Sequence, residues 1–384
     1  MIGEIKTLDD VNVKNKRVLV RLDLNSDIIN RKLIPSDRLI APLQTLMELR
    51  KRGAITVILA HQGRPKSKDF TSLKPHYLFL KKYIPNLKFV NDIIGTRAQH
   101  SISSLKQGDV LLLDNVRFIK DELNYSKDKI KENKLLKILA PLFSLYINDA
   151  FSASHREHAS IVAFPKLMES CIGRVFQQEL QAIQKLHMSN ALYVLGGAKP
   201  EDNVKLLKNN RVLASGLFGP FCLMSLGVKL GKQNKIMQDD LKTYSGTIKS
   251  NHNNLILPTD LAIEHNKKRL DLSIEEFPVD NEILDLGINT IEAYVREILN
   301  ARAVFFKGLV GLCNKPDFEI GTKALLLALA QNKGFTVVSG GHTLTMLEKF
   351  NIPKSSFSYV SLSGGALIHY LANHTLLGIE AMIK

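Results

Sequence analysis

Short, continuous apolar runs alternate with amphipathic helical stretches along the whole chain. Segments such as RLIAPLQTLMELRKRG and KALLLALAQNKG carry apolar residues at helical spacing and end at a glycine, a normal helix stop. Apolar strands that alternate with helices are typical of parallel sheets covered on both faces. We therefore predict an α/β fold with two doubly wound, Rossmann-like parallel-sheet lobes joined by a hinge helix. The predicted strands cover residues 17–24, 55–60, 110–115, 145–149, 191–195, 211–215, 255–257, 303–306, 335–339 and 358–362.

The predicted strands change character near the middle of the chain. Those of the first half end in charged residues, and those of the second half end in glycines, with the helical stretch GRVFQQELQAIQKLHMSN between them. A chain of 384 residues is long enough for two domains. We predict an N-terminal lobe over residues 1–172, a hinge helix over 173–190 and a C-terminal lobe over 191–363.

The charge balance predicts anionic partners. Lys and Arg total 52 and Asp and Glu total 37, for a net charge of +15, which attracts phosphorylated metabolites, nucleotides, nucleic acid or an acidic membrane surface. The three cysteines, Cys171, Cys222 and Cys313, lie far apart without metal-ligand spacing, which favours a reducing compartment. The first residues include no apolar leader, and no apolar run is long enough to cross a membrane. We expect a cytoplasmic protein with no membrane partner.

Glycine turns follow several strands of the second half and lead into helices. They read GGAKPED, GLFG, GGHTLTM and SGGALIHYL. Glycine allows a ligand to approach the backbone closely, and a helix start presents free N–H groups that suit phosphate. One such turn often serves packing alone, but their recurrence predicts a nucleotide-binding lobe. Lys199 follows two glycines and can neutralise a phosphoryl group in transfer.

Other nucleotide-binding classes are disfavoured by their missing motifs. The chain has no GxxxxGK[ST] loop, no GxGxxG fingerprint, and no HRD or DFG motif. A P-loop ATPase, an ordinary dehydrogenase and a protein kinase are therefore disfavoured.

Arginines and histidines follow the strands of the first half. If one sheet carries these strands, the side chains converge at one edge, where arginine forks bind carboxylate and phosphate. Each arginine taken singly is a normal surface residue, but their common location predicts a site for a small acid bearing both groups. Asp23 and Asn25 could hold a hydroxyl of this acid or orient an arginine. The converging residues are Arg38, His61, Arg64, Arg117, His155, Arg156 and His158.

Together these stretches resemble the phosphoglycerate kinase family, nearly from end to end. The matching stretches, in the family's order, are RVLVRLDLN, AHQGRP, LLLDNVRF, INDAFSASHREHAS, VLGGAKPED, LPTD, GTKALLLALA, TVVSGGHT and VSLSGGALIHYL. The forms HQGRP and GGHT are most similar to the archaeal branch. The resemblance implies a two-lobed enzyme that closes around ATP and 3-phosphoglycerate and yields ADP and 1,3-bisphosphoglycerate, reversibly, in glycolysis and gluconeogenesis. It also implies Mg²⁺ carried by the nucleotide and a C-terminal segment, residues 364–384, that packs back on the first lobe.

The resemblance further implies roles for individual residues, with Arg38 and Lys199 as the catalytic residues. The protein ligands of magnesium stay unknown, and the chain is expected to be a monomer or a homodimer. The implied phosphoglycerate pocket consists of Asp23, Leu24, Asn25, Arg38, His61, Gln62, Gly63, Arg64, Arg117 and Arg156. The implied nucleotide site consists of Lys199, Gly216, Asn314, Ser339, Gly340, Gly341, His342 and Thr343.

The nucleotide side departs from the family's pattern. Asn203 stands where most members carry a second lysine, and Lys307 stands where they carry an asparagine. Leu309 replaces a proline, His342 stands where many members have a magnesium-holding aspartate, and Asn314 replaces a glutamate expected on the ribose. Loss of that carboxylate removes a contact worth about 1–2 kcal/mol. We hypothesise that Lys307 takes over from the missing lysine.

Two other functions remain as alternatives. One is a paralogue that binds phosphoglycerate but has weak or altered nucleotide use. The other is a basic nucleic-acid-binding protein, which the charge alone suggests. No aromatic–basic module, zinc finger or helix-turn-helix supports it, so we expect no dedicated nucleic-acid partner.

Overall fold

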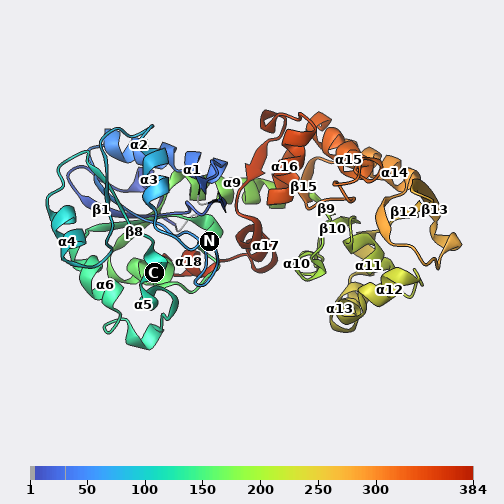
Figure 1. Cartoon of the computed structure of the whole chain (residues 1–384), viewed down its shortest axis with the longest axis horizontal. Coiled ribbons are helices and arrows are strands. Elements are labelled where there is room, and N and C mark those ends of the chain that lie inside the picture. The colour runs from blue at the N-terminus through green and yellow to red at the C-terminus, as the bar shows by residue number, and fades with distance from the viewer. Residues whose placement is uncertain (1–4, 31, 384) are drawn as a thin grey trace. The chain divides into compact units, whose positions relative to one another are not determined.

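The structure is a computed structural model that describes residues 5–30 and 32–383 (Figure 1). Packing divides the chain into two units. Unit 1 contains Met1–Gln181 and Asn373–Lys384, and unit 2 contains Ala182–Ala372. The division falls within helix α9 (Arg174–Met188). By this division the chain returns to unit 1 at Asn373, which is the last residue of α17 (Gly364–Asn373).

Unit 1 is built on a six-stranded parallel sheet in the order β5-β6-β4-β1-β7-β8. The chain leaves β1 toward β4 on one side and later continues from β7 toward β8 on the other. Ligands of open α/β sheets bind where connections diverge in this way, outside the carboxyl ends of the strands. The strands are β1 (Arg17–Leu22), β4 (Ile55–Leu59), β5 (Leu87–Val90), β6 (Val110–Leu113), β7 (Leu145–Asp149) and β8 (Glu169–Ile172), beside a hairpin of β2 (Ile28–Ile29) and β3 (Lys32–Leu33). The helices are α1 (Asp37–Ile40), α2 (Leu43–Lys51), α3 (Lys74–Leu80), α4 (Thr96–Ser103), α5 (Lys120–Leu123), α6 (Lys134–Leu139), α7 (Ala159–Val162), α8 (Phe164–Leu167) and α18 (Leu377–Glu380).

The side chains of β1 show that both faces of this sheet are covered. Val18, Val20 and Leu22 pack in one apolar cluster with residues of α2, whereas Leu19 packs in a second cluster with residues of α4. Successive strand side chains point to opposite faces. A strand buried on both faces therefore reads as a continuous apolar run, which is why it could be predicted.

Unit 2 repeats this architecture with a six-stranded parallel sheet in the order β11-β10-β9-β15-β16-β17. Its connections diverge between β9 and β15. The strands are β9 (Leu192–Leu195), β10 (Arg211–Ala214), β11 (Leu255–Ile256), β15 (Ala303–Lys307), β16 (Phe335–Ser339) and β17 (Tyr359–Ser361). Besides α17, the helices are α10 (Pro200–Val204), α11 (Phe218–Ser225), α12 (Lys232–Ile236), α13 (Gln238–Ser250), α14 (Ile288–Asn300), α15 (Ile320–Gln331) and α16 (Gly341–Lys349).

The two parallel-sheet units confirm the predicted fold class, and each predicted strand corresponds to a strand within two residues at either end. The prediction missed β5, β8, the β2–β3 hairpin and an antiparallel sheet in unit 2 with the order β13-β12-β14. That sheet consists of β12 (Asp260–His265), β13 (Lys268–Ser273) and β14 (Ile283–Leu286). Its hairpin turns at Asn266 and Lys267, both with positive φ, and a lysine at the second turn position lacks the usual glycine signal.

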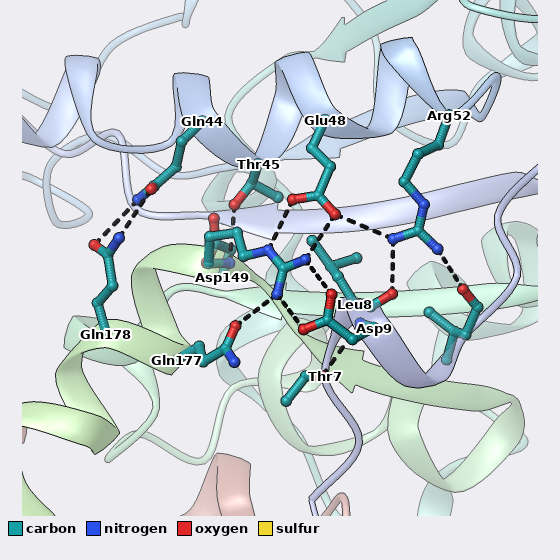
Figure 2. Close-up of polar contacts among 12 residues, drawn as sticks. Thr7, Leu8, Asp9, Gln44, Thr45, Glu48, Arg52, Asp149, Gln177 and Gln178 are labelled. Carbon is teal, nitrogen blue, oxygen red and sulfur yellow. Dashed lines mark hydrogen bonds and ion pairs between the residues drawn. The ribbon is translucent and has the colours of Figure 1, made fainter.

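Helix α9 is anchored to unit 1 at its first turn (Figure 2). The Arg174 guanidinium donates to both carboxylate oxygens of Asp9 at 2.7 and 2.6 Å and to both of Glu48 at 2.7 and 2.8 Å. The buried Asp149 carboxylate, at the end of β7, accepts from the Phe176 N–H at 3.1 Å. None of the helices in the described residues is long and apolar enough to span a bilayer.

Candidate functional sites in the two units

Arginine side chains gather at the carboxyl ends of the strands of unit 1. Arg38 lies in α1, and Arg64, Arg117 and Arg156 follow β4, β6 and β7. Their mutual influence is visible at Arg156, whose pKa is lowered first by burial and then by the positive charges of neighbouring arginines, while Asp23 opposes the shift. Burial, followed by the charges of Arg156 and Arg21, lowers the pKa of Arg117 to about 10. The cluster is a concentrated positive site that an anionic ligand would stabilise.

Asp23 and Asn25 organise one side of this arginine cluster. Arg38 Nη1 lies 3.4 Å from Asp23 Oδ2 and 3.4 Å from the Asn25 carbonyl. The Asn25 side chain accepts from the Gly63 N–H at 2.8 Å, and the Ser152 hydroxyl donates to Asp23. The sequence suggested that Asp23 and Asn25 could orient an arginine, and in the structure both residues contact Arg38.

Several predicted pocket residues lie beneath the surface. Leu24 and Gln62 are fully buried. Gln62 donates to the Ser26 carbonyl at 2.9 Å, and its side-chain oxygen contacts His76 Nε2 at 3.0 Å. Gly63 has a φ of +68°, and a Cβ there would come within 2.7 Å of the Asp69 backbone. These contacts hold the loop after β4 in place, whereas Arg64 in the same loop is exposed.

A buried polar network that the sequence analysis missed supports His61. Arg21 Nη2 lies 3.0 Å from His61 Nδ1, and Arg21 Nε donates to the Ser160 hydroxyl at 2.9 Å. Ser160 in turn donates to Glu122 through its hydroxyl at 2.7 Å and its N–H at 2.8 Å. Because a guanidinium only donates, His61 Nδ1 accepts and Nε2 carries the ring proton. Burial, followed by the nearby arginine charges, lowers the pKa of His61 well below its ordinary value.

The remaining histidines of the predicted set, His155 and His158, also follow β7 at the carboxyl edge of this sheet. The Arg156 Nε donates to His155 Nε2 at 3.3 Å. His158 Nδ1 lies 3.7 Å from Glu122 Oε1, and burial together with the arginine charges lowers the pKa of His158 to about 3. A charged Arg21 inside a strand carries no sequence signal that separates it from a surface arginine.

Unit 2 contains a cavity of about 500 Å³ at the carboxyl ends of β9 and β15, where the sheet's connections diverge. Glycines bring the loops of its wall together. The Gly197 N–H donates to the Leu309 carbonyl at 2.7 Å, and a Cβ on Gly308 would come within 2.5 Å of Gly196. Any side chain at Gly216 would collide with the Leu309 carbonyl at 2.4 Å. The glycine turns therefore let the loops pack closely, and they leave the cavity wall free of side chains at these positions.

The first turn of α16 forms another part of the cavity wall. Gly340, with a φ of +108°, precedes the helix, and Gly341, His342 and Thr343 begin it. The Thr343 hydroxyl is buried without a hydrogen-bond partner in the described structure. A helix start of this kind offers free N–H groups and a positive dipole end to an anion.

The cavity unites most of the predicted nucleotide residues but not all of them. Lys199, Gly216, Gly340, Gly341, His342 and Thr343 line it. Ser339 is buried at the end of β16 outside the lining, and Asn314 is exposed and also outside it. Sequence analysis missed the lining by Gln233 and Ile236 of α12 and by residues 282–285, segments without a glycine motif.

Lys307 and Asn203, two of the residues that depart from the family's pattern, are in contact. The Lys307 ammonium donates to Asn203 Oδ1 at 2.8 Å and lies 3.6 Å from Asp202 Oδ2. Lys307 and Asp202 line the cavity, while Asn203 is buried behind it. Among the described residues, no group of three or more His, Cys, Asp or Glu side chains is arranged to hold a metal ion.

The chain is an α/β protein with an arginine cluster in one unit and a glycine-walled cavity with lysines in the other, and its family relationships make it a phosphotransferase. The model of the phosphoglycerate kinase family matches residues 8–374, and the chain belongs to this family.

Phosphoglycerate kinases of known sequence or structure match this chain over nearly its whole length. The phosphoglycerate kinase of Methanopyrus kandleri is 35% identical, over 100% of this chain and 98% of the relative. That of Methanothermobacter thermautotrophicus is 36% identical, over 99% and 97%. The crystal structure of phosphoglycerate kinase from Pyrococcus horikoshii superposes with a TM-score of 0.86 at 29% identity and covers 98% of both chains. Archaeal relatives of this kind confirm the predicted similarity to the archaeal branch.

Proposed function

We propose that the chain transfers a phosphoryl group reversibly between ATP and the carboxylate of 3-phosphoglycerate, with Mg²⁺ carried by the nucleotide. One chain contains both an arginine cluster suited to a small acid and a glycine-walled cavity suited to a nucleotide, and this combination supports the proposal. Family membership supports both halves of the reaction.

The arginine cluster supports binding of the acid. Arg64, Arg117 and Arg156 supply forks that match carboxylate and phosphate groups. Arg38 is the candidate for the transferring phosphoryl group, because its side chain is 35% exposed and its ion pair with Asp23 is long, at 3.4 Å. A neutral His61 presents its Nε2–H as a hydrogen-bond donor without adding charge.

The cavity of unit 2 supports binding of the nucleotide. Its aliphatic lining, which includes Leu217, Ile236 and Leu312, suits an apolar base, while Lys199 and the start of α16 suit phosphates. Phosphoryl transfer needs positioning and positive charge rather than a covalent intermediate. We propose that residues 1–172 and 191–363 act as the two lobes and that residues 364–384 pack back on the first lobe. Movement about residues 173–190 would then align the substrates and exclude water.

The experiment that tests this proposal is a coupled assay of Mg²⁺- and ATP-dependent phosphorylation of 3-phosphoglycerate. We expect turnover on the order of 10 s⁻¹. Arg38→Ala and Lys199→Ala should each lower kcat by about 100-fold or more, the usual effect of losing one electrostatic contact to a transition state. The exposed Lys208→Met variant is the control and should match the wild type.

A paralogue with altered nucleotide use is the second candidate, because Asn314 lies exposed and outside the cavity. Calorimetric binding of 3-phosphoglycerate without turnover on any common nucleotide would favour it. We propose the cytoplasm as the compartment, where both substrates are available, and a monomer or homodimer as the working form.

A further inference from the structure

The Lys307 side chain is held in one position at the wall of the unit 2 cavity. Its ammonium donates to Asn203 Oδ1, and the Asn203 amide nitrogen donates to the Gly196 carbonyl at 3.0 Å. These two bonds fix the orientation of the amide, so its oxygen faces the lysine. The Lys307 carbonyl also accepts from the Gly196 N–H at 2.8 Å. The tip of β15, the turn after β9 and Asn203 near the end of α10 thus form one hydrogen-bonded corner.

The corner contains a cation that packing alone does not require. The Lys307 side chain is 13% exposed, and burying an ammonium is costly unless its donors are satisfied. An ammonium has three donors, and the described contacts supply Asn203 at 2.8 Å and Asp202 at the longer distance of 3.6 Å. A donor remains for a ligand in the cavity, which Lys199 lines as well.

We infer that Lys307, held in place by Asn203, supplies a second phosphate-binding cation of the nucleotide cavity beside Lys199. Because the two side chains meet at 2.8 Å, a lysine at either position would bring an ammonium to the same corner, from α10 or from β15. The inference rests on the proposed function and assigns Lys307 to a phosphate group of a nucleoside di- or triphosphate.

The first test compares ligands with and without phosphate. The Kd of MgADP is measured by calorimetry and that of adenosine by saturation-transfer NMR, for the wild type, Lys307→Met and the charge-matched control Lys208→Met. Lys307→Met should weaken MgADP binding by about 10- to 100-fold, as expected for a charged hydrogen bond, and leave adenosine binding unchanged. Equal weakening of both ligands, or of neither, would overturn the inference.

The second test exchanges the two residues. Lys307→Asn should weaken MgADP binding, and the double variant N203K/K307N should restore it to within about threefold of the wild type. A double variant that folds, judged by circular dichroism, but binds MgADP no better than Lys307→Asn would refute the shared position. Lys307→Arg, which keeps the charge, gives an independent measurement if the exchange disturbs folding, and it should bind MgADP more tightly than Lys307→Met.

The outcomes separate this inference from the proposed function. A wild-type chain that fails to bind MgADP contradicts the proposed nucleotide site and, with it, the role of Lys307. A wild-type chain that binds MgADP, together with a Lys307→Met variant that binds it equally well, overturns the role of Lys307 alone.

Discussion

Arg21 and Glu122 are charged side chains without exposed surface beneath the arginine cluster. They are joined through the Ser160 hydroxyl. Burial raises the pKa of Glu122, while the Arg21 charge and the Ser160 hydrogen bonds oppose the rise. Because a buried positive charge needs a counter-charge, and because Glu122 reaches Arg21 through Ser160, we take Glu122 as the ionised partner.

Replacing Glu122 tests this assignment. Glu122→Gln keeps the shape but leaves the Arg21 charge uncompensated, so we expect a loss of about 3–5 kcal/mol in the free energy of unfolding, measured in urea. The exposed Asp128→Asn is the control and should change stability by less than about 0.5 kcal/mol. A small effect of Glu122→Gln would mean that the carboxyl is already protonated.

His76 predicts acid destabilisation. Burial lowers its pKa from 6.5 to about 4, so the unfolded chain binds the proton more tightly than the folded chain. The stabilisation is complete above pH 6.5 and is lost as the pH falls toward 4. The full loss in the free energy of unfolding is about 3 kcal/mol, of which about 2 kcal/mol is already lost at pH 5. Urea unfolding at pH 7 and pH 5 should show a loss about 2 kcal/mol smaller in His76→Gln than in the wild type. The exposed His100→Gln is the control, and an equal loss in His76→Gln would contradict the prediction.

At the scale of elements, several hydrogen bonds tie the start of α9 to unit 1. Gly173 is needed there, because a Cβ would lie 2.3 Å from the Asp149 carboxyl carbon. Burial raises the pKa of Asp149 to about 7 against hydrogen bonds from Thr45 and the first turn of α9. Asp9 and Glu48 of unit 1, together with Gln177 of the same turn, accept hydrogen bonds from Arg174 (Figure 2). A helix proposed as a hinge thus has one firmly held end in unit 1.

Removing the Arg174 fork should loosen that end. The Arg174 side chain is 21% exposed, so its two carboxylate contacts are only partly screened. We expect Arg174→Met to cost about 1–3 kcal/mol and to speed amide exchange in the first turns of α9. Arg50→Met, on the exposed face of α2, is the matched control. Unchanged amide exchange in α9 would show that the remaining contacts, among them the one from Asp149, are enough to hold the helix.

At the scale of the whole molecule, each unit has its own sheet, and all residues that line the cavity belong to unit 2. Because a unit with its own core is able to fold alone, we expect residues 174–372, which include all of α9, to fold as an isolated fragment. Its MgADP affinity should lie within about threefold of the full chain's by calorimetry. A folded fragment without affinity would show that the cavity needs residues of unit 1.

Much of the fold follows from local patterns. Strands such as β7 and β16 lie in continuous apolar runs because parallel sheets are buried on both faces. The segment expected as one helix after Arg38 divides into α1 and α2 at Pro42, whose ring interrupts helical hydrogen bonding. The antiparallel sheet escaped prediction because β13 alternates between exposed and half-buried residues and has little apolar signal.

For the sites, the residue types and the strand ends that carry them can be read from the sequence: arginines in the first half, and glycines and Lys199 in the second. Which of these residues meet depends on the folded chain. It placed Arg21 against His61, kept Asn314 out of the cavity, and brought Lys307 to Asn203, 104 positions away in the chain. The physical reason is that helix and strand periods are local, whereas contact between distant side chains depends on strand order and on how closely glycine turns allow loops to approach.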